Sequence, residues 1–474
     1  MAKGPTAPRG ALAGRSIAFL HPYTLDGGGG ERVLWCAVRA VAEEWPGCAV
    51  AIYTGDEGVS GEELQRRAAQ QFGVRFRLHT PLRVVHLRRR RLVAPSTYPR
   101  FTLLGQAVGS VLLAFEALSK LKPDIVIDTA GYAFFYLVAK WLYGVRVVAY
   151  VHYPTISTDM LQVVRERKTQ FNNSAAITSS TVRSMAKLMY YYIFAWWYCL
   201  AGRCADVVMV NSSWTARHIR SLWRPSARRF RIVYPPCDTK QLQELSLEGR
   251  ALHARDPLHF ISVAQFRPEK NHALQLRAFA RASKAVPNNA GKRLHLHIVG
   301  SCRNQDDEER VTQLRRLASD LGLEKTITFH VSIPYETLCG LLSRCVGGLH
   351  TMRDEHFGIV LVEYMASGVI PIAHRSGGPL EDIVVTRTGQ EQDEHPPLQN
   401  RVVSEQEKEQ KQVGYLAETE EEYASCIEAL AGLPEADRVA MATRARERAA
   451  QFSEAEFARQ FISAIQVQVP GCAN

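Results

Sequence analysis

The sequence predicts an α/β protein made of two doubly wound domains, each a parallel sheet covered by helices. First, short β-branched or aromatic runs alternate with longer helical stretches, which is typical of parallel sheets with crossover helices. Second, this alternation starts afresh after a break near residue 240. Third, 474 residues, 46% of them hydrophobic, suffice for two cores at roughly 100–200 residues per domain. Because such folds bind ligands at the carboxyl ends of their strands, we expect an interdomain cleft.

The strands predicted in the first half are Ile17–Tyr23, Ala49–Tyr53, Asp124–Thr129, Arg146–Val151, Asp206–Asn211 and Arg231–Tyr234. Those predicted in the second half are His259–Gln265, Leu294–Gly300, Thr326–Val331, Gly347–Thr351 and Val369–His374. Pro235, Pro236 and the polar stretch 239–257 separate the two series. We therefore expect domains at 1–240 and 241–452, followed by a segment 453–474 whose helix, Ser453–Val467, packs back on the fold. Residues 387–412, which are rich in Glu, Gln and Lys, are expected to form a solvated loop or a disordered insertion.

The net charge is +11, and it is distributed unevenly along the chain. Residues 1–240 carry 32 Lys and Arg against 15 Asp and Glu, a balance of +17, whereas residues 241–474 carry 26 against 32, a balance of −6. A basic half suits nucleic acid, anionic lipid or a phosphorylated substrate. The ten cysteines are dispersed without C-x-x-C spacing, so we expect reduced thiols and a reducing compartment. The N-terminus has no long apolar run, so neither a cleaved secretory signal nor an N-terminal anchor is expected within this sequence.

Four glycines follow the first predicted strand, just before a helix predicted at Glu31–Val41. Gly27, Gly28, Gly29 and Gly30 would let backbone N–H groups approach an anionic ligand closely. The spacing matches neither G-x-G-x-x-G nor a P-loop, and a plain flexible turn is the alternative interpretation. Asp26 beside them is a candidate contact to an acceptor substrate, and a helix-flanking Asx cap is the alternative interpretation.

The second half carries cations and carboxylates at two strand ends. QFRPEKNH places Arg267 and Lys270 after one strand, where adjacent cations suit a diphosphate, although alone they would be read as a solvated basic turn. After another strand, Glu355 precedes the helix predicted at Gly358–Ser367 and Glu363 lies inside it. A nucleotide sugar fits this order, with its diphosphate on the N–H groups of Phe357, Gly358 and Ile359. Its sugar hydroxyls would then contact Glu355 and its ribose diol Glu363.

Several longer motifs resemble a known family over nearly the whole chain. GGGGER, RPEK, EHFGIVLVE and SGGP are similar to segments of the retaining GT-B glycosyltransferases of family four. More narrowly, FLHPY, GGGGERVLWCA, YVHYPTISTDM, DVVMVNSSWT, YPPCD, QFRPEKNH and LHTMRDEHFGI resemble the GDP-mannose-dependent α-1,2-mannosyltransferases of lipid-linked oligosaccharide assembly. The resemblance implies two facing Rossmann-like domains. It also implies transfer of the fourth and fifth mannoses from GDP-mannose to a dolichol-pyrophosphate oligosaccharide, on the cytosolic face of the endoplasmic reticulum membrane.

The resemblance also implies roles for individual residues. Arg267 and Lys270 would neutralise the donor pyrophosphate, although they are separated here by two residues and in many relatives by four or five. Glu355 would hold the donor sugar and Glu363 the ribose. His152, in AYVHYP, matches the family's active-site histidine and would hydrogen-bond the donor sugar across the cleft, whereas a lone His at a strand end is more often structural. The anomeric configuration would be retained, and front-face attack is favoured because no carboxylate stands out as a nucleophile.

No metal site and no cofactor are expected, because the chain has no D-x-D and no His/Asp cluster at ligand spacing, while cations and a helix N-terminus supply positive charge. The expected partners are GDP-mannose, the dolichol-linked acceptor, a membrane surface and other enzymes of the same pathway. Leu188–Gly202 and Phe101–Leu118 are apolar, aromatic-rich stretches near arginines 88–91, so they suit the headgroup level of a bilayer, with burial in the core as the alternative. Other functions left open are a different nucleotide-sugar transferase and a non-catalytic membrane scaffold. Nucleic-acid binding is disfavoured, since the aromatics are not interleaved with Arg.

Overall fold

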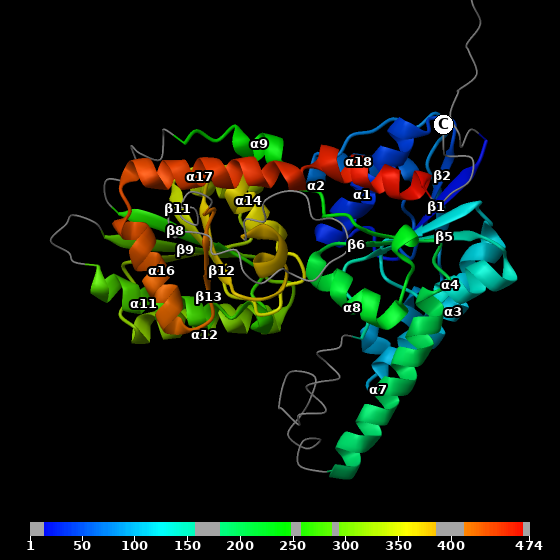
Figure 1. The fold of residues 1–474 in the computed structure, drawn as a ribbon, viewed down its shortest axis with the longest axis horizontal. Helices are drawn as coiled ribbons and strands as arrows, with labels where there is room; N and C mark the ends of the chain where they lie inside the picture. Colours follow the sequence, from blue (N-terminus) through cyan, green and yellow to red (C-terminus); the bar gives the residue numbers. More distant parts are fainter. Residues whose placement is uncertain (1–13, 157–180, 248–256, 287–292, 385–411, 468–474) are drawn as a thin grey trace, which may run out of the picture. The chain divides into compact units, whose positions relative to one another are not determined.

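The computed structural model describes residues 14–156, 181–247, 257–286, 293–384 and 412–467. By its contacts the chain divides into two compact units (Figure 1), residues 1–236 with 455–474 and residues 237–454. Almost all of the segment 387–412, for which a loop was predicted, lies outside the described residues. The nine cysteines within the described ranges are free thiols.

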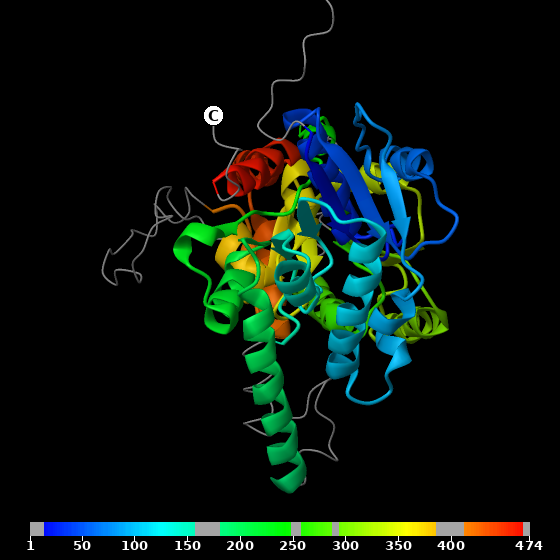
Figure 2. The same cartoon turned by 90° about the vertical axis from the view of Figure 1, so that its right-hand side faces the viewer.

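The first unit is a seven-stranded parallel sheet with helices on both faces (Figures 1 and 2). Its strands are β1 Ser16–Leu20, β2 Ala49–Thr54, β3 Arg83–His86, β4 Ile125–Asp128, β5 Arg146–Val151, β6 Val207–Val210 and β7 Phe230–Ile232, in the order β3-β2-β1-β4-β5-β6-β7. Its helices are α1 Gly29–Glu44, α2 Gly61–Phe72, α3 Thr102–Lys120, α4 Phe135–Leu137, α7 Thr181–Gly202, α8 Ser213–Trp223 and α18 Glu454–Gln466. Short helical turns are η1 Arg90–Val93, η2 Pro95–Thr97, η3 Val138–Leu142 and η4 Ala227–Arg229.

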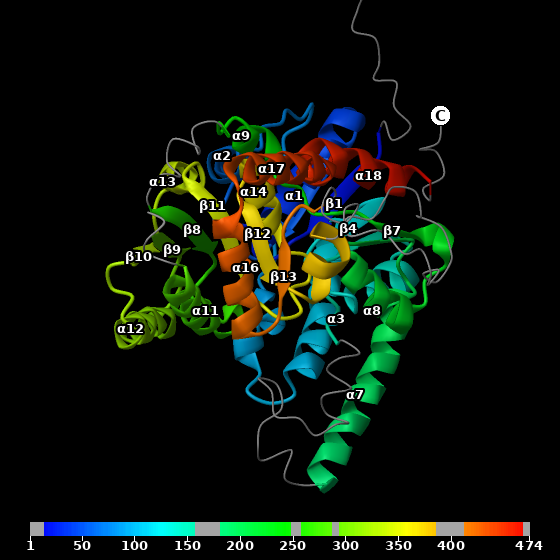
Figure 3. The ribbon, with the colours of Figure 1, turned by 60° about the vertical axis from the view of Figure 1, so that its left-hand side comes forward.

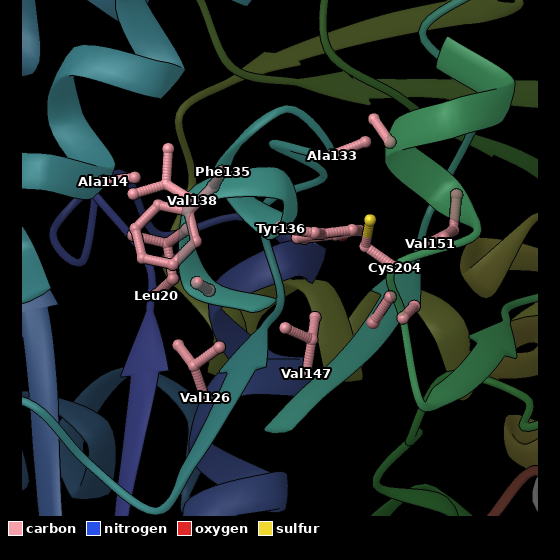
Figure 4. Packing of buried hydrophobic residues seen from close by; sticks show 14 of the residues in the cluster. Leu20, Ala114, Val126, Ala133, Phe135, Tyr136, Val138, Val147, Val151 and Cys204 are labelled. Carbon is pink, nitrogen blue, oxygen red and sulfur yellow. The ribbon is translucent and has the colours of Figure 1, made fainter. Parts of the chain in front are cut away.

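Two cores cover the two faces of this sheet. One face packs against α3, α4, α7 and α8 (Figure 4), and the other packs against α1, α2 and α18. The strands are apolar on both faces, as expected for a parallel sheet buried between two helical layers. Helix α18 joins the second core through Phe457, Phe461 and Ile465, and the Phe457 ring lies 6.1 Å from that of Tyr150. The C-terminal helix is therefore part of the first unit.

The second unit is a six-stranded parallel sheet in the order β10-β9-β8-β11-β12-β13 (Figure 3). Its strands are β8 Leu258–Val263, β9 Leu294–Gly300, β10 Ile327–Val331, β11 Cys345–His350, β12 Ile370–His374 and β13 Tyr415–Ala417. Its helices are α9 Thr239–Gln243, α11 His272–Ala285, α12 Gln305–Asp320, α13 Tyr335–Leu342, α14 Ile359–Ser367, α16 Glu420–Gly432 and α17 Glu435–Ala449, with the short turns η5 Pro268–Lys270, η7 Pro379–Ile383 and η8 Ala450–Phe452. Helices α11, α12 and α16 lie on one side of the sheet, and α9, α14 and α17 on the other (Figures 1 and 3).

These two parallel, doubly wound sheets confirm the predicted α/β class. The prediction missed two edge strands, β3 and β13, whose sequences RVVH and YLA show little hydrophobic alternation. In each sheet the strand order reverses once, between β1 and β4 and between β8 and β11. At such a switch point the loops after the two neighbouring strands diverge and leave room for a ligand. The candidate residues should therefore be sought there.

Candidate active site

The second unit brings Lys270 and Glu355 together at its switch point. Lys270 ends the turn η5 that follows β8, and Glu355 lies in the loop between β11 and α14. Because β8 and β11 are paired neighbours, both loops leave the same edge of the sheet. Lys270 Nζ lies 2.6 Å from Glu355 Oε2, and both side chains are largely buried. The cation and the carboxylate, for which the sequence predicted separate contacts, form one ion pair.

A histidine that the sequence analysis did not single out contacts the same carboxylate. Nε2 of His350, the last residue of β11, lies 3.2 Å from Glu355 Oε2. Burial alone would raise the pKa of Glu355, but the hydrogen bond from His350 and the charge of Lys270 outweigh it and lower that pKa far below its usual range. Glu355 is therefore a carboxylate at neutral pH. It is an acceptor suited to sugar hydroxyls.

Arg267 is not part of this cluster. Its guanidinium lies 3.6 Å from Glu269, and its Nε is buried without a hydrogen-bond partner among the described residues. The sequence interpretation paired Arg267 with Lys270, whereas the structure joins only Lys270 to Glu355. Arg267 begins η5 from its N-cap position.

The loop that carries Glu355 is fixed by the segment after β12. Ser376 Oγ accepts a hydrogen bond from the backbone N–H of Asp354 at 2.7 Å, and the Gly378 N–H donates to the Glu355 carbonyl at 2.8 Å. Gly377 has φ +60°, and a Cβ there would lie 2.3 Å from the carbonyl oxygen of Glu355. Only glycine permits both this conformation and this approach. The SGGP motif thus positions Glu355, a role that the sequence analysis did not assign.

We expect Gly377→Ala to destabilise the protein more than a matched control, Gly322→Ala. Gly322 has φ +71° with no atom within 4 Å of its Cβ position, so its substitution incurs only the left-handed penalty of about 1–2 kcal/mol. Gly377→Ala adds the clash with the Glu355 carbonyl. Thermal unfolding of both variants measures the difference, and equal midpoints would contradict the assigned packing.

Helix α14 presents its N-terminus beside Glu355. Gly358 is its N-cap with φ +102°, Ile359 is its first residue, and the buried Phe357 packs against Phe452 at 5.4 Å between ring centroids. The first N–H groups of a helix have no intrahelical acceptor and attract anions. Glu363 is the fifth residue of α14. Burial of Tyr335 and of Cys339 raises the pKa of each, and the negative charge of Glu363 also raises both pKa values.

In the first unit the glycine segment is partly helical. Helix α1 begins at Gly29, two residues before the predicted start, so Gly29 and Gly30 lie in its first turn rather than in a loop. Gly28 is the N-cap, and its N–H donates to Glu31 Oε2 at 2.5 Å. Gly27, with φ +75°, supplies the left-handed turn. The N-cap position of this helix is therefore held by Gly28 and not by Asp26.

His152, at the end of β5, lies beside this helix start. Its Nε2 is 3.1 Å from the Thr129 carbonyl oxygen, and a Cβ at Gly30 would lie 3.9 Å from that nitrogen. His21 contacts Glu31 at 3.3 Å and the Thr129 hydroxyl at 2.8 Å. The loops after β1, β4 and β5 therefore meet around the switch point. Sequence reasoning gave no role to His21 or Thr129. Their signals were their place just after β1 and β4 and, for His21, the motif FLHPY.

Asp26 lies on the exposed side of this segment. Partial burial of its carboxyl, followed by the charges of Glu31 and Asp56, raises its pKa. No group of three or more His, Cys, Asp or Glu side chains within the described ranges has the arrangement of a metal site.

Solved structures share this fold. Anabaena HepE in complex with UDP and glucose has a TM-score of 0.59 at 16% identity, over 95% of this chain and 99% of that one. The glycosyltransferase WaaG has a TM-score of 0.58 at 13% identity, over 95% of this chain and 99% of that one. These likenesses identify the fold as GT-B, as the sequence predicted.

Family models and curated relatives are more specific. Residues 14–223 match the model described as ALG11 mannosyltransferase N-terminus, and residues 248–390 match glycosyl transferases group 1. Proteins named GDP-Man:Man(3)GlcNAc(2)-PP-Dol alpha-1,2-mannosyltransferase are 46% identical in Homo sapiens, over 95% of this chain and 86% of the relative, and 40% identical in Dictyostelium discoideum, over 95% and 84%. With the Lys270–Glu355 pair at the switch point of a GT-B fold, these matches show that the chain belongs to the family of GDP-Man:Man(3)GlcNAc(2)-PP-Dol α-1,2-mannosyltransferases.

Proposed function

We propose that this protein transfers mannose from GDP-mannose in α-1,2 linkage to dolichol-pyrophosphate-linked trimannosyl chitobiose, and then to the product of that transfer. The observation that carries this proposal is 46% identity, over 95% of the chain, to a relative named for that donor and acceptor. The buried ion pair of Lys270 and Glu355 beside a helix N-terminus supports it, because a nucleotide sugar presents a diphosphate and a polyhydroxyl ring to such a site.

The second unit would bind the donor. Lys270 and the N–H groups at the start of α14 would hold the diphosphate, Glu355 the mannose and Glu363 the ribose. Arg267, at the N-cap of η5, would add a second cation from the same turn as Lys270. In the first unit, His152 would hydrogen-bond the donor sugar. The segment from Asp26 to Gly30 would face the acceptor.

The chemistry would retain the anomeric configuration, since donor and product linkages are both α. The leaving diphosphate would depart from C1 as the acceptor hydroxyl attacks from the same face, and a diphosphate oxygen would accept the hydroxyl proton. Lys270 and the helix N–H groups would stabilise the negative charge that develops on the diphosphate. A β-linked product, identified by NMR, would exclude this mechanism.

The transfer reaction is tested with purified protein, GDP-mannose and a synthetic lipid that carries trimannosyl chitobiosyl pyrophosphate. We expect products heavier by one and by two hexoses, both sensitive to an α-1,2-mannosidase. UDP-sugars in place of GDP-mannose test for a different donor. No product with any donor, from protein whose folding is verified by circular dichroism, would favour the scaffold alternative.

We expect the activity to persist in excess EDTA. Lys270, Arg267 and backbone N–H groups supply the positive charge that a divalent cation provides in metal-dependent transferases. The rate of product formation with and without chelator measures this. Activity that EDTA abolishes and magnesium or manganese restores would contradict metal independence.

We further propose that the first unit docks on a membrane surface through an exposed apolar patch. The patch lies on the contacting helices α3 and α7 and on η3, which packs against α3. Helices α3 and α7 meet where the Phe101 ring lies 5.7 Å from that of Tyr190 and the Leu104 N–H donates to the Tyr190 hydroxyl at 3.2 Å. Its side chains are 39–68% exposed: Phe101, Leu104, Val108, Leu112 and Phe115 at α3, Trp141 and Leu142 in η3, and Met185, Met189, Tyr192, Ile193, Trp196 and Trp197 on α7. Figure 2 shows α7 projecting from the sheet of its unit.

Both helices have a buried face and an apolar outer face. On the part of α7 whose side chains the structure describes, Tyr191, Phe194, Tyr198 and Ala201 are buried, at helical spacing opposite the exposed stripe. Burial in the core, the alternative to a membrane contact, therefore explains one face of each helix but not the exposed apolar face. Within the described ranges, α3 is long and apolar enough to cross a membrane by length and composition, but its buried residues, such as Leu113 and Ala117, pack on the sheet. An interfacial position is consistent with both faces.

Positive charge borders the patch. Arg88, Arg89, Arg91 and Arg100 are exposed before α3, and Lys187 and Arg203 bracket the aromatic part of α7. Anionic headgroups attract such residues. Because the proposed acceptor is anchored in a bilayer by dolichol and GDP-mannose is a soluble nucleotide sugar, we propose the cytosolic face of the endoplasmic reticulum membrane as its place of action.

A further inference from the structure

Two donors contact one oxygen of Glu355, and they differ in mobility. Lys270 Nζ is 2.6 Å and His350 Nε2 is 3.2 Å from Oε2. Lys270 reaches the oxygen through a long, flexible side chain that is 22% exposed, whereas the His350 side chain is 4% exposed at the end of β11. Lys270 can therefore reorient, and His350 cannot do so without repacking the strand end.

Donor binding would change the environment of Glu355. In the proposed function, Lys270 contacts the donor diphosphate, and an ammonium shared with a second anion binds the carboxylate less tightly. Glu355 would then be a buried carboxylate with one weakened partner, which is unfavourable unless another donor remains. His350 is the remaining donor to Oε2 among the described side chains.

The geometry around His350 suits this role. A hydrogen bond to the carboxylate requires a proton on Nε2, and Nδ1 has no partner within the described ranges. The His350 backbone is held independently of its side chain, because its carbonyl accepts from the Tyr423 hydroxyl at 2.9 Å and β11 pairs with β12. The imidazole is thus not needed to hold the strand, and among the described residues its polar contact is the one with Glu355.

We infer that His350 is a positioning residue of the transfer reaction: its Nε2–H holds the Glu355 carboxylate towards the donor sugar when Lys270 turns to the diphosphate. This inference rests on the proposed function of Glu355 and Lys270. The histidine acts through Glu355 and does not itself touch the substrate.

Two amide substitutions separate this role from packing. The amide nitrogen of glutamine reaches about as far as Nε2 of histidine, whereas that of asparagine reaches only as far as Nδ1. With saturating acceptor lipid, we expect His350→Gln to keep kcat within about threefold of the unchanged protein. We expect His350→Asn to lower kcat by about tenfold or more, because it loses a hydrogen bond to a charged group, while KM for GDP-mannose changes less. The control is His295→Asn. His295 lies near the amino end of β9, whereas His350 lies at the carboxyl end of β11, so this substitution should leave kcat unchanged.

A double substitution shows whether His350 acts through Glu355. In a Glu355→Ala background, His350→Asn should cause no further loss of kcat, since the group that it positions is gone. Full additivity of the two losses would overturn the inference, as would unchanged kcat in His350→Asn. Equal losses in the Gln and Asn variants, in parallel with lower thermal midpoints, would assign His350 a packing role instead. If Glu355→Ala itself retains full activity, the proposed function of the site fails rather than this inference alone.

Discussion

Glu355→Ala should lower the turnover number for mannose transfer by roughly 10- to 150-fold, the effect of losing a charge-assisted hydrogen bond worth about 1.5–3 kcal/mol. The carboxylate is proposed to contact the reacting sugar, so its contribution should be largest when the glycosidic bond breaks. Glu363 lies more than one turn inside helix α14 and is proposed to contact the ribose. Because the ribose does not react, Glu363→Ala should instead raise the KM for GDP-mannose. Steady-state kinetics with varied GDP-mannose separate kcat from KM for both variants.

The control for lost charge is Glu421→Ala. Glu421 pairs with Arg281 at 2.9 Å, but both side chains are more than half exposed, so the pair contributes little. Its removal should leave kcat and KM unchanged. Near-normal turnover and donor affinity in both Glu355→Ala and Glu363→Ala would mean that the helix α14 does not bind a nucleotide sugar.

Replacing Arg88, Arg89 and Arg91 by Ser should weaken binding to anionic liposomes by roughly a hundredfold at low salt. Each basic residue near an anionic surface contributes about 1 kcal/mol, and a factor of ten corresponds to about 1.4 kcal/mol. Arg90 is left unchanged because its guanidinium is paired with Asp56, so its loss would disturb the fold as well as the charge. Flotation with liposomes of mixed neutral and anionic lipid measures the bound fraction.

Salt should weaken this binding only in part. Screening acts on the arginines over a Debye length of about 8 Å at physiological ionic strength, but not on apolar contacts. Replacing Ile193, Trp196 and Trp197 by Ser should therefore remove the binding that persists in high salt.

A matched control removes as many exposed charges from the second unit, by replacing Arg277, Arg281 and Lys284 on α11 with Ser. It should float like the unchanged protein. An unchanged protein that stays in the soluble fraction with anionic liposomes at low salt would overturn the docking proposal.

The fold was largely predictable because the burial of strands in a parallel sheet requires a recognisable apolar pattern in the local sequence. The strands Arg146–Val151 and Leu294–Gly300 were predicted with the observed bounds. The first is an almost continuous apolar run, as is required where both faces of a strand are covered. The second alternates leucine with histidine before its apolar end, the pattern of a strand with one fully buried face. The start of α1 was misplaced because glycines are poor helix formers, and the hydrogen bond from the Gly28 N–H to the Glu31 side chain, which stabilises a helix start at Gly29, was not anticipated.

The sequence by itself determined the fold class and the family and made Lys270, Glu355 and Glu363 candidate donor-site residues, because residue type and motif spacing are local properties. Only the tertiary structure decided which of these side chains meet. Lys270 and Glu355 are 85 residues apart and join because β8 and β11 are neighbours where the sheet order reverses. His350 and Gly377 gained their roles the same way, from the 3.2 Å contact with the carboxylate and from the space denied to a Cβ. Such contacts depend on the pairing of distant strands, which no short window of sequence contains.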